Sequence, residues 1–165
     1  ILVILMFIIS IFYISLNKDP AYSTKDLEGN KINNFQLEHF TNNKIISQKD
    51  LTDTNFTLIN FWASWCGPCK IEHPFLLKLN EEEKMKIIGV NFKDKRNQAV
   101  NFLNNYGNPY DLLTKDTLGK QSVNFGIYGI PESILINKDL VIIKKYIGPI
   151  RINDYKEIIS IIKND

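Results

Sequence analysis

The sequence predicts an α/β fold in which a mixed central sheet is flanked by helices on both faces. Residues 57–63 and 87–92 are two short, continuously apolar runs, a pattern typical of strands that are buried on both faces. A segment with helical spacing separates them, so the unit is strand, helix, strand, with parallel strands. Two later runs, 133–136 and 140–147, flank the turn Asn137-Lys138-Asp139 and add an antiparallel hairpin.

The chain begins with an apolar segment, which predicts a membrane anchor. Residues 1–16 are uncharged and almost wholly apolar, and a bilayer span takes about 20 such residues, so we expect a transmembrane anchor truncated at its N-terminus. The alternative is a signal-peptide core that is cut away, but the polar, bulky residues Asn17-Lys18-Asp19-Pro20 offer no cleavage site of small residues. Either interpretation places the rest of the chain outside the cytoplasm. Residues 17–32 are polar and contain Pro20 and Gly29, which indicates a linker.

The folded domain is predicted to span residues 33–165. The alternating segment 35–40 is a candidate edge strand, and the turn Asn42-Asn43 leads from it into residues 44–47. Apolar residues at helical spacing predict four helices. The first spans residues 66–80 and contains Pro74, the second ends at Gly107, and the last two span residues 118–125 and 152–162.

Composition gives no support for nucleic-acid binding. Hydrophobic residues make up 44% of the chain, enough for a core, and the formal net charge is only +2, with no basic stripe. Lys144 and Lys145, in the second strand of the hairpin, are interpreted as a solvated strand face. The two cysteines both lie in the motif Cys66-Gly67-Pro68-Cys69, so they close on each other or react with a partner's sulfur.

The Cys-x-x-Cys motif lies between the buried strand 57–63 and the helix 66–80, which is the geometry of a redox-active dithiol. A thiolate attacks disulfides, and a helix N-terminus favours negative charge. Cys66 is therefore predicted to be an exposed nucleophile with a lowered pKa, and Cys69, one turn into the helix, to resolve the mixed disulfide. Gly67 leaves room for a substrate to approach the backbone, and Pro68 suits the first helical turn.

Two other interpretations of the cysteines are open. A structural disulfide between residues three apart closes too small a loop to stabilise the fold much. A metal site would use Cys66, Cys69 and His73, which recur at roughly helical spacing. Zinc normally takes four ligands, however, and no fourth is evident in the sequence. The sequence therefore favours the redox pair, and it predicts neither a bound metal nor a cofactor.

Two motifs resemble signatures of the thioredoxin superfamily. Its active-site segment is similar to Phe61-Trp62-Ala63-Ser64-Trp65-Cys66-Gly67-Pro68-Cys69-Lys70, followed by Pro74, and its cis-proline loop is similar to Gly129-Ile130-Pro131. The resemblance implies a thioredoxin-like fold in which a cis Pro131 faces the disulfide, where the alternative is an ordinary trans proline in a turn. It also implies that the backbone of Ile130 pairs with an incoming peptide strand. Trp62 and Trp65 are interpreted as packing around the disulfide, and Trp65 also as shaping the docking surface.

The chain resembles one group of that superfamily in particular, the periplasmic thiol:disulfide interchange proteins of the DsbE family. The resemblance rests on the tripeptide Glu72-His73-Pro74 and on the segment Gly126-Ile127-Tyr128-Gly129-Ile130-Pro131-Glu132-Ser133. Asn60 departs from ordinary thioredoxins, which usually have at this position a buried aspartate that relays a proton. The dipeptide Gly67-Pro68 is thioredoxin-like and goes with a reducing potential.

The resemblance also bears on two carboxyl groups, those of Glu72 and Glu132. In one interpretation both are solvated surface groups. In the other they flank the disulfide, accept the proton of Cys69, raise the pKa of Cys66 by like-charge repulsion and form an acidic patch that selects partners. The resemblance favours the second, which makes both glutamates catalytic residues together with Cys66, Cys69 and Pro131.

The resemblance implies a thiol:disulfide oxidoreductase on the periplasmic side of the bacterial inner membrane, tethered by residues 1–16. Its expected substrate is apocytochrome c, whose Cys-x-x-Cys-His must be reduced before haem attaches, or a haem-ligation factor that carries it. Because the periplasm is oxidising, a transmembrane thiol reductase is the expected electron donor. The alternatives are a general envelope thiol:disulfide reductase and a non-enzymatic metallochaperone that uses Cys66, Cys69 and His73.

Overall fold

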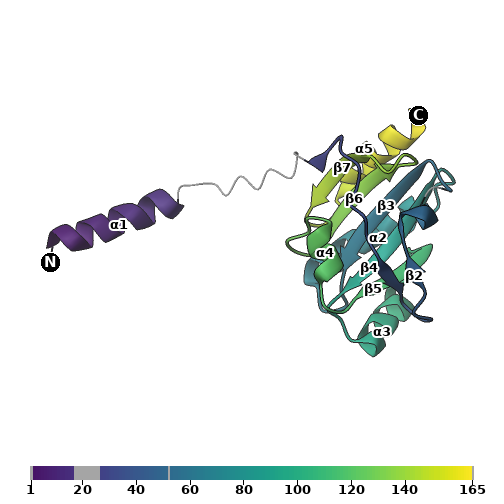
Figure 1. Cartoon of the computed structure of the whole chain (residues 1–165), viewed down its shortest axis with the longest axis horizontal. Coiled ribbons are helices and arrows are strands. Elements are labelled where there is room, and N and C mark those ends of the chain that lie inside the picture. The colour runs from purple at the N-terminus through teal and green to yellow at the C-terminus, as the bar shows by residue number, and fades with distance from the viewer. Residues whose placement is uncertain (1, 17–26, 52, 165) are drawn as a thin grey trace.

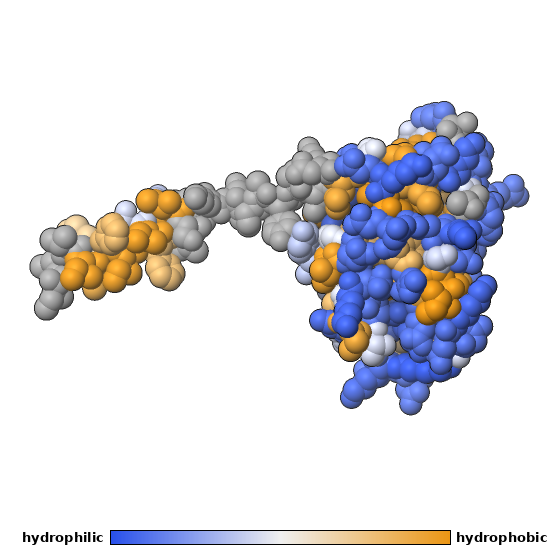
Figure 2. All heavy atoms as spheres, in the orientation of Figure 1, coloured by the Kyte–Doolittle hydropathy of each residue, from blue (hydrophilic) through white to orange (hydrophobic). Residues whose placement is uncertain are grey.

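The computed structural model describes residues 2–16, 27–51 and 53–164. The first of these ranges is a helix, α1 (Leu2–Leu16), whose apolar side chains between Ile4 and Ile14 are exposed and stand out in orange in Figure 2. Among the described residues, no helix combines the length and the apolarity needed to cross a membrane. Most of the predicted linker, 17–32, lies outside the described residues.

A seven-stranded mixed sheet forms the centre of the domain (Figure 1). In chain order its strands are β1 (Leu37–His39), β2 (Ile45–Ile46), β3 (Phe56–Trp62), β4 (Met85–Phe92), β5 (Leu112–Asp116), β6 (Glu132–Asn137) and β7 (Ile142–Ile147). In space the order is β2-β1-β5-β4-β3-β6-β7. β3, β4 and β5 are parallel, and the other strands join antiparallel to their neighbours. The carboxyl ends of the parallel strands therefore meet at one end of the sheet.

Side chains of β3 alternate between two cores, one on each face of the sheet. All seven residues of the strand are buried, which explains the continuous apolar run in the sequence. Leu58 and Trp62 face one core, and Ile59 and Phe61 face the other. The central strand thus holds the two layers of the domain together.

Helices cover both faces of the sheet, as predicted, but unequally. The core around Trp62 is covered by α2 (Gly67–Leu79), α3 (Arg96–Tyr106) and α5 (Ile152–Lys163), which contribute Leu76, Phe102 and Ile158, respectively. The core around Phe61 is covered by residues 32–36 before β1, by the short 3-10 helix η2 (Gln48–Leu51) after β2, and by residues next to α4 (Lys120–Asn124). Asn124 of α4 donates to the Asn34 carbonyl at 2.7 Å, which ties the helix to this layer.

Two features of the fold were not expected from the sequence. β5 was not predicted, yet it lies between β1 and β4 and widens the sheet. Ile32 is buried in the core and donates its backbone N–H to the Leu140 carbonyl at 2.9 Å. Packing of the domain therefore begins before the boundary predicted at residue 33.

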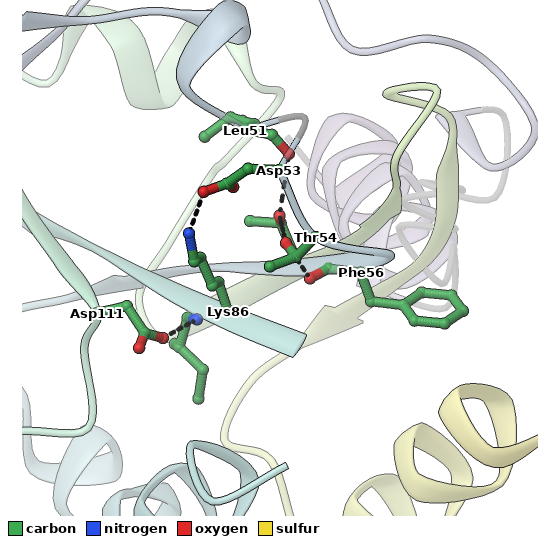
Figure 3. A network of polar contacts seen from close by, with 8 residues as sticks. Leu51, Asp53, Thr54, Phe56, Lys86 and Asp111 are labelled. Carbon is green, nitrogen blue, oxygen red and sulfur yellow. Dashed lines mark hydrogen bonds and ion pairs between the residues drawn. The ribbon is translucent and has the colours of Figure 1, made fainter. Parts of the chain in front are cut away.

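A polar network closes the end of the sheet where β3 and β4 begin (Figure 3). Asp111 Oδ2 accepts the backbone N–H of Ile87 at 2.7 Å and the side-chain amide of Asn80 at 3.0 Å. Nearby, Asp53 forms an ion pair with Lys86. These contacts fix the amino-terminal ends of the parallel strands, and the cysteines lie at the other end.

Candidate active site

The predicted functional residues meet at the end of the sheet where β3 stops and β6 starts. β3 ends at Trp62 and leads directly into the Cys-x-x-Cys turn. Glu132, the first residue of β6, pairs with Phe61 in antiparallel register, so the preceding residues 126–131 reach the same end of the sheet. We call these residues the 126–131 loop. Its Ile130–Pro131 peptide bond is cis, which confirms the prediction from the sequence.

Cys66 and Cys69 form a disulfide at the start of α2. Cys66 is the N-cap residue, and its Sγ accepts the backbone N–H of Cys69 at 3.2 Å, so the sulfur lies where a helix favours negative charge. Cys66 is only 3% exposed in this oxidised state, whereas an exposed nucleophile was predicted. The disulfide turns its sulfur back onto the helix, and the exposed surface belongs to its neighbours Trp65, Gly67 and Pro68.

Three of the four predicted substrate-binding residues are neighbours of the cysteines in the chain, and the fourth, Ile130, belongs to the 126–131 loop at the same end of the sheet. Trp65 is 57% exposed, and Gly67 and Pro68 are exposed beside it. A Cβ added to Gly67 would meet no atom within 4 Å, so a partner's backbone has open space there. Ile130 is half-buried and packs against the core that contains both cysteines. The geometry supports a docking surface, and the binding roles of these residues stay a prediction.

Asp94, in the turn after β4, fixes the segment that leads into the cysteines. One carboxylate oxygen accepts the backbone N–H of Ser64 at 2.6 Å, and the other accepts the Ser64 hydroxyl at 2.8 Å. The same carboxylate also accepts N–H groups of Asn91 and Lys95. Next to it, the Trp65 indole N–H donates to the Lys93 carbonyl at 3.2 Å. Sequence reasoning missed Asp94, although its place just after a buried strand, 87–92, was a usable signal.

Glu72 is completely buried in a polar network under α2. It lies one turn after Cys69, on the buried face of the helix. Its Oε1 accepts the side-chain amide of Asn60 at 2.8 Å, and its Oε2 accepts the backbone N–H of Ile150 at 3.0 Å. Asn60 in turn accepts the Tyr110 hydroxyl at 3.0 Å. The network thus joins α2, the helix that contains Cys69, to β3 and to the segment before α5.

Burial gives Glu72 an unusual pKa. Desolvation raises it to about 7, and the hydrogen bonds from Ile150 and Asn60 only partly offset this effect. Burial also raises the pKa of Tyr110, and the neighbouring Glu72 charge adds to that shift. A carboxyl group with a pKa near 7 can take up and release a proton at neutral pH, which Asn60 cannot do.

Glu132 is also buried, and it faces the 126–131 loop. Its Oε1 accepts the backbone N–H groups of Tyr128 at 3.1 Å and Gly129 at 3.0 Å. Its Oε2 lies 2.9 Å from the ammonium nitrogen of Lys145 on β7, and the Lys145 side chain has no exposed surface. The interpretation of Lys145 as part of a solvated face is therefore wrong, because its charge is paired inside the protein.

The two glutamates do not form the acidic surface patch that the sequence predicted. Glu72 is 0% and Glu132 is 3% exposed, and each carboxylate is engaged by donors inside the domain. Burial thus excludes direct contact of either carboxylate with a docked partner in this state. A proton-transfer role is compatible with the position of Glu72, and that role stays a prediction.

His73 is a packing residue. Its Nε2 lies 3.0 Å from the Gly107 carbonyl, and its ring meets that of Phe102 edge-on at 5.1 Å between centroids. Burial lowers its pKa. In the part of the chain that the structure describes, no three His, Cys, Asp or Glu side chains are grouped to hold a metal ion. The structure therefore gives no support to a site of Cys66, Cys69 and His73.

The sequence is similar to known thiol:disulfide interchange proteins. The family model described as Redoxin matches residues 27–159. The chain is 37% identical over 147 residues to the thiol:disulfide interchange protein DsbE of Pseudomonas fluorescens biotype C, a match that covers 88% of this chain and 82% of that protein. It is 34% identical over 139 residues to the thiol:disulfide interchange protein HelX of Rhodobacter capsulatus, covering 84% and 78% of the two chains.

Solved structures are similar as well. A Chlorobium tepidum protein described as a thiol:disulfide interchange protein DsbE superposes with a TM-score of 0.69 at 25% identity, over 83% of this chain and 96% of that one. A thioredoxin-like protein of Aeropyrum pernix gives the same TM-score, 0.69, at 20% identity, over 80% and 89% of the two chains. The second likeness concerns the fold alone, and it agrees with the thioredoxin-like architecture.

Proposed function

Because the chain belongs to the Redoxin family, and within it to the thiol:disulfide interchange proteins of the DsbE family, we propose that it reduces a disulfide of apocytochrome c, or of a haem-ligation factor, outside the cytoplasm. The chain is a thiol:disulfide oxidoreductase. One observation supports this chemistry most directly: the only two cysteines close a disulfide at the N-terminus of α2. The 126–131 loop supplies a peptide-docking surface at the same end of the sheet.

The proposed reaction transfers two electrons from the reduced cysteine pair to the partner. The Cys66 thiolate attacks one sulfur of the partner's disulfide, that S–S bond breaks, and a mixed disulfide forms while the partner's other sulfur leaves as a thiolate. Cys69 then loses its proton and attacks the Cys66 sulfur. The mixed disulfide breaks, the partner leaves with both sulfurs reduced, and the Cys66–Cys69 disulfide remains.

We assign the proton of Cys69 to Glu72. This carboxyl group lies one turn along the same buried helix face, and its pKa of about 7 suits uptake of a proton at neutral pH. Asn60, which stands where thioredoxins usually have the acid, supports Glu72 by donating a hydrogen bond to it at 2.8 Å. The acid–base group has therefore moved from the strand to the helix.

Residues 1–16 are proposed to tether the domain to the periplasmic face of the inner membrane. Support comes from the uncharged, apolar sequence and from the helix that it forms, α1. A tether keeps the domain close to membrane-bound assembly factors and to a transmembrane thiol reductase, which re-reduces the disulfide. Extraction of cell membranes with alkaline carbonate tests this point: a tethered chain stays in the pellet, and a released one appears in the supernatant.

Reduction of a defined peptide disulfide tests the proposed substrate. The full chain, reduced and kept in detergent, is mixed with an oxidised peptide that contains Cys-x-x-Cys-His, and with a second peptide of equal disulfide spacing and unrelated sequence. We expect faster reduction of the first peptide, and none by Cys66→Ser. Equal rates for both peptides would indicate a general envelope reductase, and no reduction of either would contradict the proposal.

A further inference from the structure

We propose that the buried ion pair between Glu132 and Lys145 is a positioning device that presets the backbone of the 126–131 loop for partner docking. Glu132 then has a positioning role in place of the proton-transfer role predicted from the sequence, and Lys145, which the sequence had suggested was solvated, acts as its partner. The effect of the ion pair on partner docking rests on the proposed function, whereas its effect on the loop backbone does not.

The four polar contacts of the pair form a closed path through the loop. Lys145 Nζ donates to the carbonyl of Gly126 at 2.6 Å, at the start of the loop. The same nitrogen lies 2.9 Å from Glu132 Oε2. Glu132 Oε1 then accepts the N–H groups of Tyr128 and Gly129 at 3.1 and 3.0 Å. The pair therefore joins a carbonyl and two amides of the loop to the first residue of β6 and to β7.

Because both charged side chains are buried, these contacts favour one backbone conformation of the loop. The side chains of Lys145 and Glu132 are 0% and 4% exposed, and a charge without its partner is strongly disfavoured inside a protein. The Lys145 ammonium also lies 5.5 Å from the centre of the Tyr128 ring, at a distance that permits a cation–π contact. The two charges pair between β6 and β7, and their further hydrogen bonds, to Gly126, Tyr128 and Gly129, form when the loop holds this backbone conformation, so the pair favours that conformation.

The loop is fixed from inside and open on its outer side. Tyr128 is 66% exposed, and a Cβ added to Gly129 would meet no atom within 4 Å. The Gly148 N–H donates to the Pro131 carbonyl at 3.0 Å, which anchors the other end of the loop beside β7. A partner strand thus meets a backbone that is already ordered, and ordering it costs no free energy on binding.

The bonding partners of Glu132 distinguish its role from that of Glu72. Both oxygens of Glu132 are occupied by fixed partners, two amides and one ammonium, that belong to the loop and to β7. Glu72 lies on the helix of the resolving cysteine instead, one turn after Cys69. We therefore expect loss of the ion pair to weaken partner docking and to leave the reactivity of the cysteines unchanged.

The test compares Lys145→Met with the matched control Lys144→Met. Lys144 is the neighbouring residue on β7 and pairs with Glu157 on the surface, with a side chain that is 37% exposed. In Lys145→Met we expect the amides of Tyr128 and Gly129 to exchange with solvent deuterium about tenfold faster than in the wild type. We also expect the KM for the peptide disulfide to rise about tenfold, with kcat and the rate of Cys66 alkylation by iodoacetamide within about twofold.

The control variant should match the wild type in all four measurements. The inference is overturned if the loop amides of Lys145→Met keep wild-type protection, or if kcat falls while KM stays constant. If Lys145→Met does not fold, the double variant Glu132→Gln/Lys145→Met replaces it, because the glutamine oxygen still accepts the two amides and no buried charge is left unpaired. That variant lacks the ion pair and the Lys145 hydrogen bond to the Gly126 carbonyl, so its loop amides should still exchange faster than those of Lys144→Met. Wild-type protection of the loop amides in this variant would overturn the inference.

The two proposals fail in different ways. If wild-type protein does not reduce the peptide, the proposed function is wrong, and the exchange of the loop amides still decides the role of the ion pair. If wild-type protein reduces the peptide and Lys145→Met behaves like Lys144→Met in every measurement, the proposed function stands and the ion pair has no positioning role.

Discussion

At the scale of single residues, the polar network under the cysteines places an amide, Asn60, on the strand and a carboxyl group, Glu72, on the helix. Asn60 occupies the strand position and supplies hydrogen bonds, to Glu72 at 2.8 Å and to Ser133 at 2.9 Å. Glu72 occupies the helix position, and we propose that it supplies the proton-exchanging group. Because Asn60 is an amide, the strand adds no second charge to a site that already buries the carboxyl group of Glu72.

Glu72 should make stability depend on pH. Burial raises its pKa from 4.5 to about 7, so between these values the folded chain binds more protons than the unfolded chain. The free energy of unfolding is then expected to fall by about 3 kcal/mol as pH rises through that window, at 1.36 kcal/mol per pKa unit. Urea unfolding of the oxidised protein between pH 4 and 8, about every half unit, measures this slope.

The matched variants for that slope are Glu72→Gln and Glu83→Gln. Glutamine at position 72 does not titrate, so the fall in stability should disappear in that variant. Glu83 is exposed, in the segment between α2 and β4, and its replacement should leave the slope as in the wild type. Identical pH slopes for the wild type and Glu72→Gln would show that the carboxyl group is not perturbed by burial.

Asp94 should matter because it holds the segment before the cysteines. Asp94→Ala leaves the backbone N–H and the hydroxyl of Ser64 without their acceptor, and hydrogen bonds to a charged group contribute about 1.5–3 kcal/mol each. Because Ser64 is half-buried, water replaces part of the lost acceptor, and we expect a loss of about 2–4 kcal/mol in the free energy of unfolding and slower reduction of a peptide disulfide. Asp139→Ala, in the exposed turn between β6 and β7, is the control. Equal stability of the two variants would refute the role of Asp94.

At the scale of secondary structure, the elements that could be predicted from the sequence are those whose burial produces a clear pattern of apolar residues. β3 is buried on both faces and was visible as a continuous apolar run, and the helix after it was marked by Pro68 and by apolar spacing. β5 (Leu-Leu-Thr-Lys-Asp) has half-buried side chains at three of its five positions, so neither a continuous run nor an alternation identifies it. Its strand conformation comes from its place between β1 and β4.

The site residues that could be predicted from the sequence are likewise those that stand in local motifs. The cysteines and Pro131 stand in motifs that local sequence reveals. The burial of Glu72 and Glu132 depends on partners far along the chain, since Ile150 is 78 residues from Glu72. The prediction that Lys145 is solvated was wrong for the same reason. A lysine in a strand is usually solvated, and the partner that buries this one, Glu132, lies on the neighbouring strand.

Packing between β4 and the segment before β5 gives a prediction at this scale. The ring of Tyr110 lies on Gly89, and a Cβ added there would come within 2.6 Å of the ring. Gly89→Ala should therefore displace the Tyr110 hydroxyl from Asn60 and lower the free energy of unfolding by about 1–3 kcal/mol. Urea unfolding checks this, with Gly129→Ala as control, because an added Cβ there meets no atom within 4 Å. Unchanged stability of Gly89→Ala would contradict the packing described.

At the scale of the whole molecule, one end of the sheet carries a structural polar network and the other carries the candidate active site. The end where β3 and β4 begin is closed by Asp111 and by the Asp53–Lys86 ion pair (Figure 3). The other end gathers the disulfide at the start of α2, the turn held by Asp94 and the 126–131 loop. Open α/β sheets place their functional groups at the carboxyl ends of the parallel strands, and this arrangement follows the rule.

Capture of partners on Cys66 tests the central claim most directly. Cys69→Ser removes the resolving thiol, so a partner attacked by Cys66 stays attached as a mixed disulfide, which mass spectrometry of proteins purified from the native membrane identifies. We expect apocytochrome c or haem-ligation factors to dominate the captured chains, and the double variant Cys66→Ser/Cys69→Ser to capture none. Capture of many unrelated envelope proteins would contradict the specialised substrate, and capture no greater than in the double variant would contradict thiol–disulfide exchange through Cys66.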